Sequence, residues 1–177
     1  MMKLIICIYF IGLIAGALCH GGGEEDDKKK RCPETWTYSE KTGFCYKAYY
    51  WSDWFAAESI CIQEGGHLAS VHTAAENSFL QTLAQNHKIG NQTTPQPSIA
   101  VEWYTIGLQY IQNKWIWTDK TPVDYLPWQA GYPTGDYLTS QDNLWVGRMS
   151  KNDGKFGNGW GIAKYFSFIC KSPALKN

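Results

Sequence analysis

The sequence lacks the features that would suit it to nucleic acid or to hydrolysis. Its 16 lysine and arginine residues balance 16 aspartate and glutamate residues, so it has no net positive field that would attract phosphates. It also has no GxSxG sequence, the sharp turn that presents the nucleophile of many serine hydrolases. We therefore expect no nucleic-acid partner and no enzymatic activity.

An apolar run long enough to stay in a membrane is also missing. The stretch from Leu4 to Leu18 is almost wholly apolar and follows Lys3, but it is shorter than the roughly 20 residues that a spanning helix needs. Ala17 and Cys19 are small side chains of the kind a signal peptidase accepts. We interpret residues 1–19 as a signal peptide, with a membrane anchor as the alternative. We expect a secreted, extracellular protein without stable membrane insertion.

A polar segment follows the predicted signal peptide. Residues 20–31 contain GGGEEDD and KKKR and no large apolar side chain, which predicts a charged, flexible linker. The basic stretch from Lys28 to Arg31 could alternatively be a processing site. A chain of 177 residues, 44% of them hydrophobic, can bury one core but hardly two. We therefore expect one domain over residues 32–172 and a tail over residues 173–177.

The cysteines indicate an oxidising compartment. Outside the predicted signal peptide there are four, Cys32, Cys45, Cys61 and Cys170. An even number behind a signal peptide predicts disulfides, for which three connectivities are possible. No pair has CxxC spacing, so zinc is not favoured, and no cysteine is left over as a catalytic nucleophile.

Two helices are predicted in the first half of the domain. The first begins at Ser52 as its cap and stops at Gly65–Gly66, where positive φ is cheap. The second opens with a capping box formed by Thr73 and Glu76. The apolar faces contain Trp54, Ala57, Ile60 and Cys61 in the first helix and Phe79, Leu80 and Leu83 in the second.

Strands are predicted over residues 67–72 and 101–108. His67 and His72 would fall on opposite faces of the first strand. We therefore expect ordinary hydrogen-bonded histidines rather than two ligands of one metal ion. Asn91 begins an Asn-Gln-Thr sequon and is a predicted glycosylation site, with chance occurrence as the alternative.

An ordered set of motifs carries a resemblance to a known family. The motifs are Cys61, GGHLASVH (65–72), WYTIGL (103–108), WIWTDKTPVDYLPW (115–128) and FSFICK (166–171). In this order, and over residues 32–172, the chain resembles the C-type lectin family. The resemblance implies an α+β fold with two helices flanking small antiparallel sheets, adjacent chain ends and one long loop region. It also implies that Cys61 pairs with Cys170 and Cys32 with Cys45.

The long loop is where we expect function. Residues 118–157 show little periodicity, and a long loop inside a compact domain is uncommon unless it is functional. Trp115 and Trp117 alternate onto one face of a short strand and are expected in the core. By contrast Trp128, Tyr132 and Tyr137 could stack on a sugar or pack on a protein, because an aromatic face offers a large rigid contact.

This sequence departs from the family at its calcium ligands. Members that bind sugar through calcium have a Glu-Pro-Asn or Gln-Pro-Asp triplet, then a glutamate before an internal cysteine, then a Trp-Asn-Asp triplet. Calcium takes six to eight oxygen ligands, several of them charged. The matching positions here are Tyr132, Thr134, Gln141, Asn158 and Gly159, without a carboxylate among them. We therefore expect no calcium and no other cofactor, although Asp136 and Asp142 could build a different site.

Two other features of the family can be compared with this sequence, one of which is missing and one of which is kept. The internal disulfide of the family falls at about Asn143 and Ile162, neither of which is cysteine. The loop proline, in contrast, remains as Pro133. The resemblance implies a cis bond before this proline, and an X-Pro bond costs only about 0.5–1 kcal/mol to hold cis. We therefore predict that Tyr132–Pro133 is cis.

The resemblance implies a secreted binding module rather than an enzyme. Its expected ligand is carbohydrate or a glycosylated surface, with a role in innate defence. The alternative is a calcium-independent protein-binding module of the same fold. The predicted ligand-binding residues are Trp128, Tyr132, Pro133, Thr134, Tyr137, Gln141 and Asn158.

Overall fold

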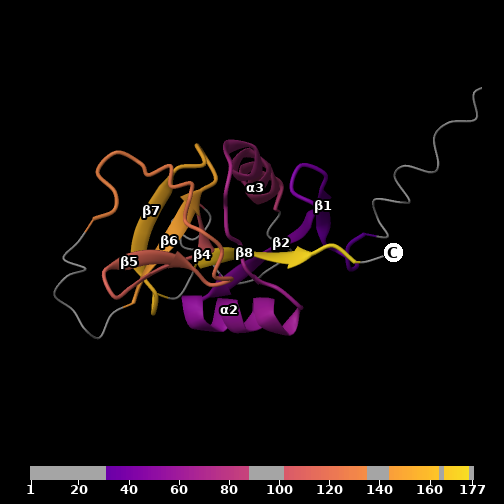
Figure 1. Cartoon of the computed structure of the whole chain (residues 1–177), viewed down its shortest axis with the longest axis horizontal. Coiled ribbons are helices and arrows are strands. Elements are labelled where there is room, and N and C mark those ends of the chain that lie inside the picture. Colours follow the sequence, from indigo (N-terminus) through magenta and orange to yellow (C-terminus); the bar gives the residue numbers. More distant parts are fainter. Residues whose placement is uncertain (1–30, 88–101, 135–143, 164–165, 176–177) are drawn as a thin grey trace, which may run out of the picture.

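The computed structural model describes residues 31–87, 102–134, 144–163 and 166–175. In chain order its elements are β1 (Thr37–Ser39), β2 (Phe44–Ser52), α2 (Trp54–Gln63), β3 (His67–Leu68), α3 (Ala74–Asn86), β4 (Trp103–Ile111), β5 (Lys114–Trp117), β6 (Trp145–Ser150), β7 (Phe156–Trp160) and β8 (Phe166–Pro173) (Figure 1). The predicted signal peptide, residues 20–30 of the predicted linker and Asn91 lie outside the described residues. Within the described ranges no helix is long and apolar enough to cross a membrane.

The strands form one mixed sheet. Its order is β1-β2-β8-β4-β6-β7, with β3 also paired to β8 and β5 to β4. Between the strands named above, every pairing is antiparallel except that of β4 with β8, where Tyr104 faces Ser167 and Thr105 faces Phe168. The predicted α+β class is confirmed, but the sheet is not purely antiparallel, because one parallel pair joins its two halves. Helices α2 and α3 lie on opposite sides of this sheet (Figure 1).

Helix α2 begins one residue later than the sequence suggested. Ser52 is the last residue of β2, and Asp53 is the cap, accepting a hydrogen bond from the Ala56 amide at 2.9 Å. Asp and Ser are equally good caps, so strand pairing decides which of the two neighbours serves. The predicted stop is confirmed, since the chain turns at Gly65 with a φ of 85°.

Helix α3 begins at the predicted cap but uses its glutamate differently. Thr73 accepts a hydrogen bond from the Glu76 amide at 3.1 Å. The Glu76 carboxylate does not return to the Thr73 amide as in a capping box. It accepts instead from the His72 amide at 2.8 Å, from Lys171 Nζ at 2.7 Å and from the Tyr46 hydroxyl. Glu76 and Lys171 form an almost fully buried ion pair.

Two hydrophobic clusters fill the space on either side of the sheet. The larger contains Leu80 and Ala84 of α3, with Phe79 and Leu83 packed against it. Trp117 is buried in the same cluster, and Trp115 packs on it partly exposed, as expected for the strand before the loop. The smaller cluster contains the buried face of α2 and all four cysteines. Both clusters are made by residues far apart in sequence, so the sheet has a core on each face.

Two disulfides staple the second cluster. Cys32 pairs with Cys45 and Cys61 pairs with Cys170, with Cα–Cα distances of 5.7 and 5.3 Å. Both predicted pairings are confirmed, and the first closes the antiparallel hairpin of β1 and β2. The Leu175 amide donates to the Arg31 carbonyl at 2.7 Å, so the two ends of the domain lie together as expected.

The predicted strand over residues 67–72 is mostly wrong. Only β3 is a strand, and residues 68–71 are fully buried without the alternation that the sequence suggested. The segment is covered on both sides, because the Ala69 amide donates to Ile169 and its carbonyl accepts from Gly107. The histidines at its ends are hydrogen-bonded as predicted, His67 to Glu58 and His72 to Asp124.

Candidate functional site

The segment after β5 is held against β7 by backbone hydrogen bonds. The Gln129 amide donates to the Phe156 carbonyl at 2.8 Å, and the Phe156 amide donates to the Pro127 carbonyl at 2.9 Å. Trp128 and Phe156 form a short parallel bridge. This segment lies, with β6 and β7, at the end of the molecule opposite the C-terminus (Figure 1). It therefore has a fixed platform beneath it.

Trp128 forms part of that platform. Its ring centroid lies 5.1 Å from Trp115 and 6.2 Å from Phe156, and the side chain is half-buried against the larger core cluster. These contacts hold the segment on the sheet. The role of Trp128 in ligand contact stays a prediction beside this packing role.

The loop residues 132–134, which match the first calcium-binding triplet of the family, lie over β4 and β7. Tyr132–Pro133 is cis, so this prediction is confirmed. The Tyr132 ring packs on Trp103 with 6.2 Å between centroids. A side chain at Gly157 would bring a Cβ to 3.0 Å from Trp103 and 3.2 Å from Tyr132. Any larger residue at this position would push against both rings, which lie directly over the β7 backbone.

Asn158 joins β7 to the loop. Its Oδ1 accepts from the Thr134 amide at 2.7 Å and its Nδ2 donates to the Thr134 carbonyl at 2.7 Å. Asn158 is only 3% exposed, so its end of both bonds is buried, whereas Thr134 lies at the surface. The structure therefore brings together four predicted residues, Tyr132, Pro133, Thr134 and Asn158. Tyr137 and Gln141 lie outside the described residues.

Arg148 of β6 is the residue of this site that the sequence reasoning missed. Its Nη2 donates to the Asn158 carbonyl at 2.7 Å, and its guanidinium lies 5.6 Å from the Trp103 ring centre. Burial lowers the pKa of Arg148 despite the opposing influence of Tyr132, and its guanidinium stays charged at neutral pH. The sequence signal was a single charged residue, Arg148, in the otherwise uncharged strand β6. Which residues Arg148 contacts depends on how β6 pairs with its neighbouring strands.

The guanidinium of Arg148 lies where a side chain on Gly159 would project. A Cβ at Gly159 would come within 2.4 Å of Arg148 Nη2. An aspartate there, as the family's calcium site has, would displace the guanidinium from the Asn158 carbonyl. The Arg148 guanidinium therefore lies beside a position that the family resemblance matches to an aspartate of calcium-binding members.

The matched calcium positions carry neutral groups in the structure. Tyr132, Thr134, Asn158 and Gly159 present a phenol, a hydroxyl, an amide and no side chain. Aligning aromatic with aromatic instead would match the Trp-Asn-Asp triplet to residues 156–158, again without a carboxylate. Among the described residues no group of three or more His, Cys, Asp or Glu side chains could hold a metal ion. Asp136 and Asp142 lie outside those residues.

These features define a small disulfide-stapled binding domain whose loop is held over the end of a mixed sheet. Residues 50–156 match the family model of the Lectin C-type domain. The chain therefore belongs to the C-type lectin domain family, and it is a lectin-like binding module. The resemblance drawn from its motifs is confirmed.

Relatives of this chain include proteins with different ligands in their names. It is 28% identical over 150 residues to a C-type lectin mannose-binding isoform of Oxyuranus scutellatus, covering 79% of this chain and 82% of the relative. It is 29% identical over 121 residues to the galactose-specific lectin nattectin of Thalassophryne nattereri, covering 68% and 70%.

Solved structures agree with the sequence comparison. The C-type carbohydrate-recognition domain of cow CD23 with a GlcNAc2Man3 oligosaccharide is similar, with a TM-score of 0.63, 25% identity, and coverage of 83% of this chain and 99% of that one. A calcium-independent type II antifreeze protein has a TM-score of 0.60 and 25% identity, covering 81% and 95%.

Proposed function

We propose that this protein is a secreted lectin that recognises carbohydrate or glycosylated surfaces without calcium and without catalysis. The ligand-binding surface is the loop held on β7, with Tyr132, Pro133 and Thr134 at its described part. Trp128, Tyr137, Gln141 and Asn158 complete the proposed set, with Asn158 hydrogen-bonded to Thr134 from β7. A role in innate defence, as the family resemblance implied, is part of this proposal.

The glycine at position 159, with the Arg148 guanidinium beside it, supports calcium independence most strongly. A divalent cation beside the Arg148 guanidinium would meet a like charge, and it would find no carboxylate at the described matched positions. The hydrogen bonds between Asn158 and Thr134 and the contact of Tyr132 with Trp103 hold the loop without an ion. Calcium is therefore not needed to shape this part of the surface.

Carbohydrate recognition is supported by the relatives and by the aromatic character of the loop. The names of two relatives specify mannose and galactose, and a third similar domain was solved with an oligosaccharide. The half-buried Tyr132 has a ring that can pack on the apolar face of a sugar, and its hydroxyl can hydrogen-bond to sugar hydroxyls. The disulfides suit an extracellular protein.

A retention experiment on sugar resins tests this proposal. The purified protein is applied to mannose-agarose and galactose-agarose, once with calcium and once with a chelator. We expect retention on at least one resin in both conditions, release by the free monosaccharide, and loss of retention in Tyr132→Ala. Tyr38→Ala, a tyrosine on β1 away from the loop, is the matched control and should behave as the unmodified chain does. Retention that the chelator abolishes would contradict the proposal.

A second candidate function is calcium-independent protein binding. It is favoured by exposed apolar side chains on neighbouring elements, since Phe55, Trp160 and Ile162 are 50%, 49% and 57% exposed. The Trp54 amide donates to the Gly161 carbonyl at 2.9 Å, which joins the start of α2 to the end of β7. If this function holds, the protein is not retained on sugar resins. It binds an extracellular protein instead, and Trp160→Ala weakens that binding.

A further inference from the structure

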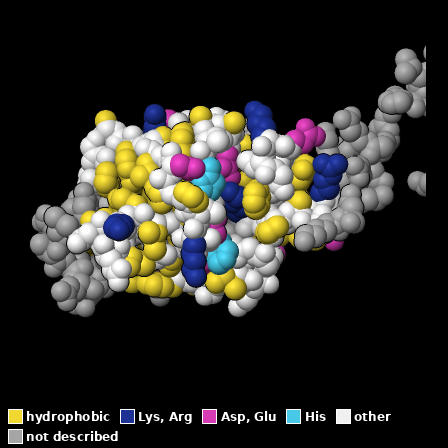
Figure 2. Space-filling view, in the orientation of Figure 1, with side chains coloured by type: hydrophobic (Ala, Val, Ile, Leu, Met, Phe, Trp, Pro, Cys, Tyr) yellow, Lys and Arg dark blue, Asp and Glu magenta, His cyan; other side chains and the backbone are white. Residues whose placement is uncertain are grey.

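A pocket on another part of the surface is not used by the proposed lectin site. Its volume is about 630 Å³, within the range of small-molecule sites. It is lined by the start of β2, by the end of α2 and the residues that follow it, by β8, and by Asp119 and Thr121 of the segment after β5. Figure 2 shows histidine, acidic and basic side chains gathered in the middle of one face, with hydrophobic side chains on both sides.

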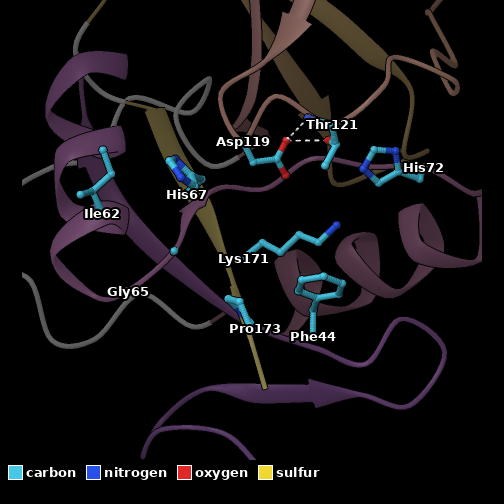
Figure 3. Close-up of a pocket in the computed structure, with 10 residues that line it drawn as sticks. Phe44, Ile62, Gly65, His67, His72, Asp119, Thr121, Lys171 and Pro173 are labelled. Atoms are coloured by element: carbon cyan, nitrogen blue, oxygen red, sulfur yellow. Dashed lines mark hydrogen bonds between the residues drawn. The ribbon is translucent and has the colours of Figure 1, made fainter. Parts of the chain in front are cut away.

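Apolar side chains form walls of the pocket. Phe44 and Pro173 face Asp119 and Thr121 across it, and Ile62 closes the side towards α2 (Figure 3). Ile62 is 54% exposed although it is a large hydrophobic residue. These walls suit a hydrocarbon or aromatic body, because apolar area removed from water stabilises the bound state.

The ammonium of Lys171 is not available to an anionic ligand. An ammonium has three N–H donors, and Lys171 Nζ has three acceptors, the Ser70 carbonyl at 3.2 Å, Ser70 Oγ at 3.2 Å and Glu76 Oε1 at 2.7 Å. A carboxylate or phosphate would have to break one of these bonds in a side chain that is 8% exposed. The lysine therefore belongs to the structure of the pocket floor.

Asp119, in contrast, keeps capacity to accept a hydrogen bond. Its Oδ1 accepts from the amide and the hydroxyl of Thr121, and among the described residues its Oδ2 accepts only from Ser70 Oγ. A carboxylate offers about four lone-pair sites, so one site on Oδ2 is left. Burial acts to raise the pKa of Asp119, but the bonds from Ser70 and Thr121 and the charge of Lys171 outweigh it and hold the pKa below its ordinary value.

The charges around the pocket have an excess of negative sign. Asp119 lines it, and three further carboxylates contact lining side chains: Glu76 at Lys171, Glu58 at His67 and Asp124 at His72. The one ammonium among these groups is that of Lys171, which Glu76 already pairs, whereas Lys120 is exposed and does not line the pocket. A cationic ligand would therefore meet a complementary potential.

We propose that this pocket binds a small organic cation, with its ammonium donating to Asp119 Oδ2 and its apolar body lying between Phe44, Ile62 and Pro173. The ligand is a protonated primary amine with a short hydrocarbon or aromatic body. This site is independent of the lectin function proposed for the loop, and either can hold without the other.

An NMR titration with four probes tests the proposal. The probes are hexylammonium, the neutral hexanol, the anionic hexanoate and methylammonium, which has the charge without the body. We expect hexylammonium to shift the amide signals of Gly65, Gly66 and Thr121 saturably. We expect hexanol to bind about ten-fold more weakly, as fits one lost charge-assisted hydrogen bond, and hexanoate and methylammonium not to saturate.

Variants with matched controls locate the site. Asp119→Asn should weaken hexylammonium about ten-fold, and Asp153→Asn, the same change at an exposed aspartate elsewhere, should not. Ile62→Ala should weaken it about three-fold or more, whereas Phe55→Ala, at an equally exposed residue of α2 outside the pocket, should leave it unchanged. If Asp119→Asn fails to fold, the comparison of the two α2 variants decides the question.

Three results would overturn the proposal. The first is tighter binding of hexanoate than of hexylammonium, which would make the pocket an anion site. The second is equal affinity of hexylammonium for Ile62→Ala and Phe55→Ala. The third is the absence of saturable shifts at the pocket amides with any of the four probes.

Discussion

Replacing Asn158 with alanine should release the loop from β7. The substitution removes both hydrogen bonds to Thr134, each 2.7 Å long and made by a side chain that is 3% exposed. A typical protein hydrogen bond contributes about 1 kcal/mol net. Thr134 itself is exposed, so water can satisfy its freed backbone groups. We therefore expect Asn158→Ala to lower the free energy of unfolding by about 2 kcal/mol, and the melting temperature by about 4–8 °C.

Hydrogen exchange measures the local effect directly. If the Thr134 amide is protected by Asn158, the variant should exchange about 30-fold faster at this position, the equivalent of about 2 kcal/mol. The Trp128 and Gln129 amides, which donate to backbone carbonyls, should change much less. Asn152→Ala, at an exposed asparagine of the turn between β6 and β7, is the matched control. Unchanged protection of Thr134 in Asn158→Ala would refute the role assigned to this side chain.

Four further outcomes follow from the geometry and chemistry of the domain. Gly159→Ala should cost about 1–2 kcal/mol by displacing the Arg148 guanidinium, and clearly less in an Arg148→Ala background; equal costs in both backgrounds would contradict the contact. Replacing the disulfide between Cys61 and Cys170 with alanines should destabilise by about 4–5 kcal/mol, since it closes a loop of 109 residues, and a non-reducing peptide map must contain this pair. Burial lowers the pKa of His87 to about 4, so between about pH 6.5 and that value the unfolded chain binds a proton that the native state does not. The free energy of unfolding should therefore fall as pH drops through this window, and it should fall less steeply in His87→Phe. Denaturant titrations at several pH values measure both, and the same pH dependence in the two proteins would contradict the prediction. Calcium at millimolar concentration should leave the melting temperature unchanged.

Much of the fold could be predicted because its signals are local or belong to an ordered motif set. Thr73 and Gly65 mark helix ends through their own backbone preferences, and the structure has both where expected. Ser52 and Asp53 compete for one cap with equal propensity, and a local pattern cannot separate them. The sequence predicts Glu76 as a capping residue, because its ion-pair partner, Lys171, is 95 residues away and a local pattern does not include it.

The site was harder to predict, because it depends on pairing between distant strands. Arg148 meets Gly159 only because β6 and β7 pair in one particular register. The pocket next to Asp119 is formed by β2, α2, β8 and the segment after β5, which no sequence period connects. The positions Tyr132 and Asn158 were found from a family resemblance, and a resemblance supplies relations between distant residues that composition and periodicity cannot.

The central claim is that this C-type lectin domain recognises carbohydrate without calcium. A glycan array probed with the purified protein, once with millimolar calcium and once with a chelator, tests both parts in one measurement. We expect the same set of bound glycans at the same intensity in the two conditions, and a weaker binding signal for Asn158→Ala. Binding that appears only with calcium, or no glycan binding in either condition, would contradict it.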